Sequence, residues 1–256
     1  MTKKYELMDE TITLKNGVVL HRIRALKSFA NVTKGDLGGW IEKEDNLSHN
    51  DNAWVCGNAK VYGNAIVYDD ARVYGNACVY DNAKVYGNVI VYDNAKVYGN
   101  VIVYDDARVY GNAWVYGYAI VCDKARVYNK TRVHGNAKVY GNAKVSGNAK
   151  VYGNANVSGN AKVYRNACIL DGHIIGNVSL SYKDIFQYQC KERMLTAILT
   201  LDNKIRYTIG CQENITEEVF IDRIHNDNGG LKNNPHREEY LRVIDCVKLY
   251  FNYKDK

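Results

Sequence analysis

A six-residue repeat runs through the middle of the chain and constrains its fold more than any other feature. Val stands at every sixth position from Val55 to Val163, and Ala, with occasional Val or Thr, stands two residues earlier from Ala53 to Ala167. Because side chains alternate across a strand, this Ala and Val point inward, while the residue between them and the following Tyr point outward. Gly-Asn, Asp-Asn or Asp-Asp then supplies a corner, since these residues tolerate positive φ. Each hexad therefore predicts one side and one corner of a coil.

The repeat weakens at both ends. The pattern predicts that Ile169 and Ile175 continue the inward row after Val163. A degenerate version precedes Ala53 and places Lys43 and His49 at positions that Val occupies elsewhere. We expect these irregular units to be coils of the same stack.

A period of six with this inward pattern resembles the hexapeptide-repeat family, whose motif is an aliphatic residue followed four positions later by a small one. Val61 and Ala65 match the motif, and so do Ile175 and Ser179. The resemblance implies a left-handed parallel β-helix with three hexads in each triangular coil. Residues 37–180 would then form about eight coils, and a spacing of about 4.8 Å between coils gives a prism roughly 40 Å long.

The segments on either side of the repeat are expected to be caps. In residues 1–36, Asn16-Gly17 between two apolar runs predicts a hairpin that covers the first coil, whose open edge would otherwise pair with other chains. Residues 181–256 predict a small α+β domain. The expected fold is therefore mainly β, with the β-helix over residues 37–180 between an N-terminal β cap and a C-terminal α+β cap.

The C-terminal domain has its own local signals. Two apolar runs on either side of Asp202-Asn203 predict a pair of strands. One helix is expected to begin at Thr216, and a second at Asn234-Pro235, where Pro would take the first helical position.

The flanking segments add a second resemblance. The stretch KGDLGGWIEKEDNLS before the repeats and the tail from SYKDIF onward are similar to hexapeptide-repeat proteins of bacteriophages and prophages, which carry a transferase label without established chemistry. The resemblance implies a viral origin and a location in the bacterial cytoplasm. That location agrees with an N-terminus without a signal-peptide core, the lack of any long apolar run, and seven Cys without a CxxC pair.

Residues 18 positions apart should lie above one another on one face of the prism. Two neighbouring faces then combine cations with aromatic rings toward the C-terminal end. Residues 124–180 hold nine Lys and Arg against one acid, Asp171, whereas residues 37–123 hold six Lys and Arg against 11 Asp and Glu. The candidate ligand-binding residues are Arg108, Tyr110, Arg126, Tyr128, Arg132, His134, Lys144, Lys150 and Tyr152.

The third face is the apolar one. Its outward row includes four isoleucines, Ile66, Ile102, Ile120 and Ile174. Exposed apolar rows often mark interfaces, although β-branched residues also suit solvated strands. Hexapeptide-repeat proteins commonly form trimers with parallel prisms, so this face is the candidate interface of a homotrimer.

Three functions are compatible with these features. Arg and Lys beside Tyr suit a small anionic ligand such as a nucleotide, which in a trimer would bind in basic, Tyr-rich clefts between subunits. A phage protein could in this way sequester a bacterial immune signal without catalysis or a cofactor. The resemblance also implies an acyl-CoA-dependent acyltransferase, for which His134 is the candidate general base. A structural or protein-binding scaffold is the third. The patch is too small to favour long nucleic acid, and no metal cluster is expected.

Overall fold

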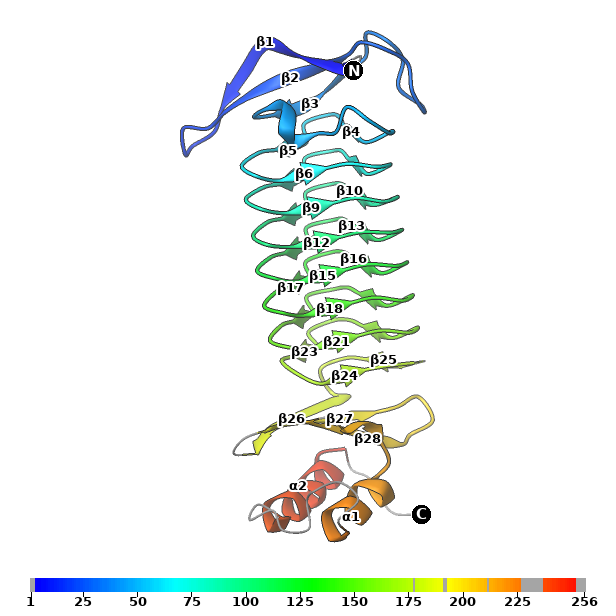
Figure 1. The fold of residues 1–256 in the computed structure, drawn as a ribbon. Coiled ribbons are helices and arrows are strands. Elements are labelled where there is room, and N and C mark those ends of the chain that lie inside the picture. Colours follow the sequence, from blue (N-terminus) through cyan, green and yellow to red (C-terminus); the bar gives the residue numbers. More distant parts are fainter. Residues whose placement is uncertain (1–2, 177, 191–192, 211, 227–236, 252–256) are drawn as a thin grey trace.

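The computed structural model describes residues 3–176, 178–190, 193–210, 212–226 and 237–251. A column of stacked coils separates two terminal caps (Figure 1). At the N-terminal end, β1 (Tyr5–Thr13) and β2 (Val19–Ala25) form an antiparallel hairpin, and β2 pairs antiparallel with β3 (Leu37–Ile41). The predicted hairpin around Asn16-Gly17 is confirmed, because Gly17 has a φ of 85° within the turn.

The column is a parallel β-solenoid of about eight coils, as predicted, and its three faces are parallel sheets. Face 1 contains β4 (Trp54–Val55), β7 (Arg72–Val73), β10 (Ile90–Val91), β13 (Arg108–Val109), β16 (Arg126–Val127), β19 (Lys144–Val145), β22 (Lys162–Val163) and β25 (Ser179–Leu180). Face 2 continues from β3 through β5 (Lys60–Val61), β8 (Cys78–Val79), β11 (Lys96–Val97), β14 (Trp114–Val115), β17 (Arg132–Val133), β20 (Lys150–Val151) and β23 (Cys168–Ile169). Face 3 contains β6 (Ile66–Val67), β9 (Lys84–Val85), β12 (Ile102–Val103), β15 (Ile120–Val121), β18 (Lys138–Val139), β21 (Asn156–Val157) and β24 (His173–Ile174).

Small inward residues let the three sheets meet around a narrow core. The repeated Val and Ala side chains, such as Val97 and Ala113, are fully buried. Each coil then hydrogen-bonds to the next through its backbone: Lys96 donates to the Ala113 carbonyl at 2.9 Å, and Tyr98 donates to the Val115 carbonyl at 3.0 Å. The apolar core and the paired backbone together satisfy the two main requirements of a buried strand.

Asparagine side chains line one corner of the column. They form an amide ladder, in which the Asn64 amide donates to Asn82 at 3.1 Å and the Asn82 amide donates to Asn100 at 3.2 Å. Asn136 donates to Asn154 in the same way at 3.2 Å. These bonds run along the axis and add side-chain contacts between coils to the backbone pairing.

The regular spacing of 18 fails at both ends of the column, which corrects two predictions. In the first coil, Ile41 pairs with Val61 across 20 positions, so Ile41 takes the inward position expected for Lys43. Leu47 bridges to Val67 and replaces His49 in the same way. The two additional residues lie between Leu47 and Val55, which are eight positions apart instead of six, whereas the short 3-10 helix η1 (Glu44–Asn46) lies in the six-residue unit before them.

In the last coil, one residue fewer separates the paired strands. Val157 pairs with Ile174, so Ile174 enters the core in place of the predicted Ile175 and is 0% exposed. The assignment of Ile174 to the outward interface row is therefore wrong. The physical reason is the shortened corner at Leu170–Gly172, which advances the inward register by one residue.

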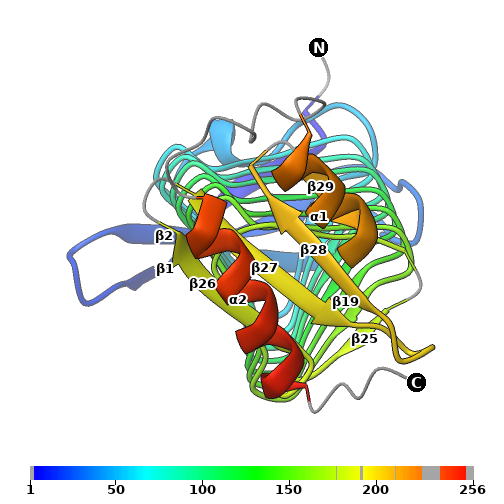
Figure 2. The same cartoon turned by 90° about the horizontal axis from the view of Figure 1, so that it is seen from below.

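A four-stranded antiparallel sheet covers the other end of the column (Figure 2). It consists of β26 (Ile185–Cys190), β27 (Arg193–Leu199), β28 (Ile205–Ile209) and β29 (Gln212–Ile215). The helices α1 (Glu217–His225) and α2 (Arg237–Tyr250) pack on the side of this sheet that faces away from the coils (Figure 1).

The local sequence signals correctly predict two strands and one helix start in this domain. Strands β27 and β28 flank Asp202-Asn203, and the Thr216 hydroxyl accepts from the Val219 N–H at 3.3 Å, as an N-cap does. The predicted helix start at Asn234-Pro235 lies outside the described residues. Neither described helix is long and apolar enough to cross a membrane.

Candidate functional site

The structure places seven of the nine predicted ligand-binding residues on both sides of one edge of the column. Arg108, Arg126 and Lys144 project from consecutive strands of face 1, and Arg132 and Lys150 project from face 2. Tyr110 and Tyr128 lie along the edge where face 1 turns into face 2. This grouping follows from the uniform register of 18 residues, which holds throughout these coils.

His134 and Tyr152 lie along a different edge, between face 2 and face 3. The His134 ring stacks between Tyr116 and Tyr152, with ring centroids 4.6 and 5.1 Å away. Burial lowers the pKa of His134, and nearby Arg132 and Lys150 lower it further. Within the described residues, the His134 ring nitrogens make no hydrogen bond, so nothing there orients the imidazole as a general base.

Arg108 has a different surrounding from the other predicted cations. It lines a hollow of about 370 Å³ on face 1 together with Asp70, Asp106 and Arg72. The carboxylates of Asp70 and Asp106 offset part of the positive charge of the two arginines in this hollow. The run of cations without neighbouring acids therefore begins one coil later, at Arg126.

The coils after Arg126 form a surface that we call the basic edge. Residues 124–170 contain nine Lys and Arg and no Asp or Glu. None of the cations on the basic edge forms an ion pair within the described part of the chain. The basic edge comprises Arg126, Tyr128, Arg132, Lys144, Ser146, Lys150, Lys162 and Tyr164.

Two contacts hold part of this surface in place. The Arg132 guanidinium lies 5.2 Å from the centre of the Trp114 ring, which also lies beneath the Lys96 ammonium at 4.9 Å. The Tyr128 ring stacks on Tyr110, with centroids 4.9 Å apart and planes inclined by 4°. Stacked rings of this kind cannot admit another ring between them, so the expectation that a base stacks among the tyrosines applies only where a row ends.

The candidate interface row has three members on the surface. Ile66 is 38% exposed, and Ile102 and Ile120 are partly exposed on adjacent strands of face 3. Lys84 separates Ile66 from Ile102. The apolar surface on face 3 is therefore narrower than the four-residue row that the sequence predicts.

Two hollows outside the basic edge were not anticipated from the sequence. One, of about 480 Å³, lies where the N-terminal segment meets the first coils and includes Asp36, Trp54, Cys56 and Arg72. Burial raises the pKa of the Cys56 thiol, which disfavours the nucleophilic thiolate.

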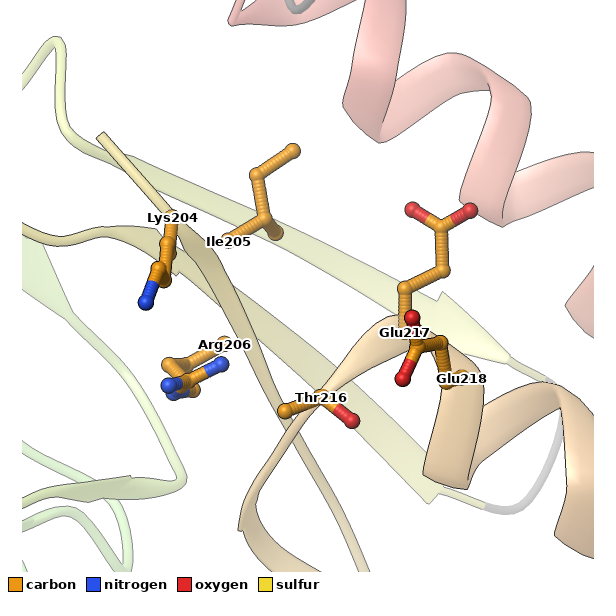
Figure 3. Close-up of a pocket in the computed structure, with 6 residues that line it drawn as sticks. All are labelled: Lys204, Ile205, Arg206, Thr216, Glu217 and Glu218. Carbon is orange, nitrogen blue, oxygen red and sulfur yellow. The ribbon is translucent and has the colours of Figure 1, made fainter. Parts of the chain in front are cut away.

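The other hollow, of about 330 Å³, lies in the C-terminal domain. Figure 3 shows Lys204 and Arg206 on one side of it and Glu217 and Glu218, from the start of α1, on the other. Glu217 already pairs with Lys248 at 2.6 Å, and Lys204 pairs with Asp202 at 3.3 Å. Two of the charged side chains that line this hollow are thus neutralised by ion pairs within the C-terminal domain.

Asp105, Cys122 and Asp123 place one potential ligand atom each within 4.8 Å of one another. Corner packing accounts for this group. Asp123 accepts from the Gly141 N–H at 2.7 Å, and Asp105 accepts from the Asp123 N–H at 3.4 Å. Burial also raises the pKa of Cys122, so its thiol stays protonated.

Comparison with known families agrees with the architecture. Residues 59–75 and 107–123 match the family model of the YdcK beta solenoid repeat. This chain is thus similar to a β-solenoid repeat family in two of its coils. A search of curated proteins found no match. The similarity concerns the coil itself and identifies no site residue.

Proposed function

We propose that this protein binds a small anionic ligand, a nucleotide, at the basic edge without transforming it. The observation that carries the proposal is the run of cations from Arg126 onward, in a stretch, residues 124–170, that contains no Asp or Glu. Ammonium and guanidinium groups without acidic partners are available for phosphate oxygens. Similar cations near the N-terminal coils lie beside Asp side chains and are less suited to this role.

The position of the cations favours a compact ligand. Arg126, Lys144 and Lys162 follow one another along face 1 at about 4.8 Å per coil, so neighbouring cations are close enough for one polyphosphate group to contact them together. Arg132 and Lys150 extend the field around the edge onto face 2. A longer nucleic acid would leave this short basic segment and meet the acidic coils.

Binding without chemistry fits the surroundings of His134 better than acyl transfer does. Both of its ring faces are covered by Tyr116 and Tyr152, and its nitrogens lack an orienting acid among the described residues. The resemblance of the flanking segments to phage proteins adds the biological part of the proposal: sequestration of a bacterial nucleotide immune signal in the host cytoplasm. A homotrimer packed through Ile66, Ile102 and Ile120 would carry three such sites. The alternative function is a protein-binding scaffold, and nucleotide titration distinguishes it from ligand binding.

The test is calorimetric titration of the full chain with ATP, ADP and cyclic dinucleotides. Arg126→Ala and Arg132→Ala should each weaken binding about tenfold or more, because a hydrogen bond to a charged group contributes roughly 1.5–3 kcal/mol. Lys84→Ala, on face 3, is the matched control and should bind like the unmodified protein. A chain that binds none of these nucleotides contradicts the proposal and favours the scaffold.

A further inference from the structure

The tyrosines after each Val form three rows along the edges of the column, and small residues interrupt two of these rows. Between face 1 and face 2, the rings of Tyr74, Tyr92, Tyr110 and Tyr128 stack in sequence, with centroids 4.7 to 5.1 Å apart. Ser146 takes the next position, and Tyr164 resumes the row one coil later. Between face 3 and face 1, Cys122 and Ser158 are the interrupting residues.

The interruption at Ser146 differs from the other two in exposure. Cys122 is 7% exposed and Ser158 is 4% exposed, so neighbouring groups close over both. Ser146 is only partly buried. The row between face 1 and face 2 is thus open to solvent at the position where one ring is missing.

The backbone keeps its regular stacking through this interruption. The Tyr128 backbone N–H donates to the Val145 carbonyl at 3.0 Å, and the Ser146 backbone N–H donates to the Val163 carbonyl at 2.8 Å. The two flanking tyrosines therefore lie two coils apart, or about 9.6 Å. That separation is about twice the 4.9 Å between the Tyr110 and Tyr128 centroids, so it matches one planar ring stacked between two others.

The chemistry around Ser146 selects what kind of ring fits. One face of Tyr128 is covered by Tyr110, which leaves its other face toward the Ser146 coil. Lys144 begins β19, two residues before Ser146, and its neighbours in the sheet are Arg126 on β16 and Lys162 on β22. The Arg165 guanidinium lies 5.6 Å from the centre of the Tyr164 ring. An aromatic ring that carries phosphate satisfies both the stacking surface and the cations.

We propose that the base of a nucleotide completes the interrupted tyrosine row, with its ring between Tyr128 and Tyr164 over Ser146 and its phosphates on Arg126, Lys144 and Lys162. This inference rests on the proposed function and names the subsite that holds the base. It also assigns a role to Ser146, whose small side chain leaves the space.

The decisive variant is Ser146→Tyr, which restores the residue found at the equivalent position in most coils and fills the space with a protein ring. ATP and inorganic tripolyphosphate are the two probes, titrated into the full chain. Ser146→Tyr should weaken ATP binding about tenfold or more, because base stacking on an aromatic ring is lost. Its affinity for tripolyphosphate should stay within about twofold of the unmodified protein, since the cations are retained.

Cys122→Tyr is the matched control, because it completes the other row on a distant edge and should leave both affinities unchanged. Tyr164→Ala removes one wall of the subsite and should weaken ATP binding selectively, which keeps the test valid if Ser146→Tyr folds poorly in thermal melts. Equal ATP affinity for Ser146→Tyr, Tyr164→Ala and the unmodified protein overturns the inference while leaving the proposed function intact. If the unmodified protein binds neither probe, the proposed function itself fails.

Discussion

At the residue scale, the corners of the coils depend on a few side chains that tolerate left-handed backbone. Gly99 has a φ of 82°, and Asp81, one coil earlier at the same corner, has a φ of 60°. The Asp81 carboxylate accepts from the Gly99 N–H at 3.2 Å. Aspartate therefore compensates for its less favourable backbone by bonding to the next coil, an option that glycine lacks.

This difference predicts the effect of two substitutions at one corner. Gly99→Ala should lower the free energy of unfolding by about 1–2 kcal/mol, the cost of left-handed backbone for an ordinary residue. The added Cβ would also lie 3.0 Å from the Gly117 backbone. Gly99→Asp should recover part of the loss, because its carboxylate can accept from Gly117 as Asp81 does from Gly99. Urea unfolding measures both, and an Asp variant less stable than the Ala variant would contradict this account.

At the element scale, the stacked tyrosines within each row shield one another from water, and this burial raises the pKa of their phenols. Burial raises the pKa of Tyr62 to about 12, with smaller contributions from Cys78 and Asp81. A hydrogen bond with Cys122, together with burial, raises the pKa of Tyr104 to about 12. The stacked phenols are therefore held in their neutral form by the fold.

The free energy of unfolding of the column should fall as the pH rises above about 10. An unfolded tyrosine loses its proton near pH 10, whereas Tyr62 and Tyr104 keep theirs until about pH 12. The unfolded state thus binds fewer protons in this interval, so the free energy of unfolding should be maintained below pH 10 and fall as pH rises toward 12. Urea unfolding across this range tests the trend. Tyr104→Phe keeps the ring and should reduce the slope of the free energy of unfolding against pH. An unchanged slope would show that Tyr104 is not a source of this pH dependence.

The elements also show how far sequence reasoning extends. Hexad spacing was sufficient to predict the coils, the inward Val and Ala, and the seven residues beside one edge, because backbone pairing enforces a constant register. It failed where a corner gains or loses residues: Ile41 and Ile174 enter the core through changes that no periodic rule contains. The sequence shows Ser146 where the neighbouring coils have Tyr, but the exposure that separates Ser146 from Cys122 depends on side-chain packing.

At the scale of the whole molecule, the column presents different chemistry on its three faces. Cations of the basic edge occupy face 1 and face 2, while Ile66, Ile102 and Ile120 lie on face 3. Packing between columns through face 3 would leave the basic edge accessible. The proposed trimer and the proposed ligand site therefore require separate surfaces.

The trimer predicts a mass three times that of the 29.0 kDa chain in size-exclusion chromatography with light scattering. Ile120→Lys should reduce the assembly to single chains, because a buried ammonium without a partner is strongly unfavourable at an apolar contact. Ile90→Lys, at the equivalent strand position on face 1, should leave the mass unchanged. An unmodified protein that elutes as a 29.0 kDa monomer would rule out this assembly.

The equivalence of the hexads has a consequence for how such a chain can vary. Removing 18 residues from the middle would delete one whole coil and bring the two ends closer by about 4.8 Å, with every later residue on its original face. Removing six would keep the local pattern intact but move every later residue to the preceding face. The C-terminal domain and the basic edge would then turn by a third of a revolution relative to the N-terminal hairpin. Copy-number change in this gene segment can therefore act either as a length adjustment or as a rotation of one end against the other.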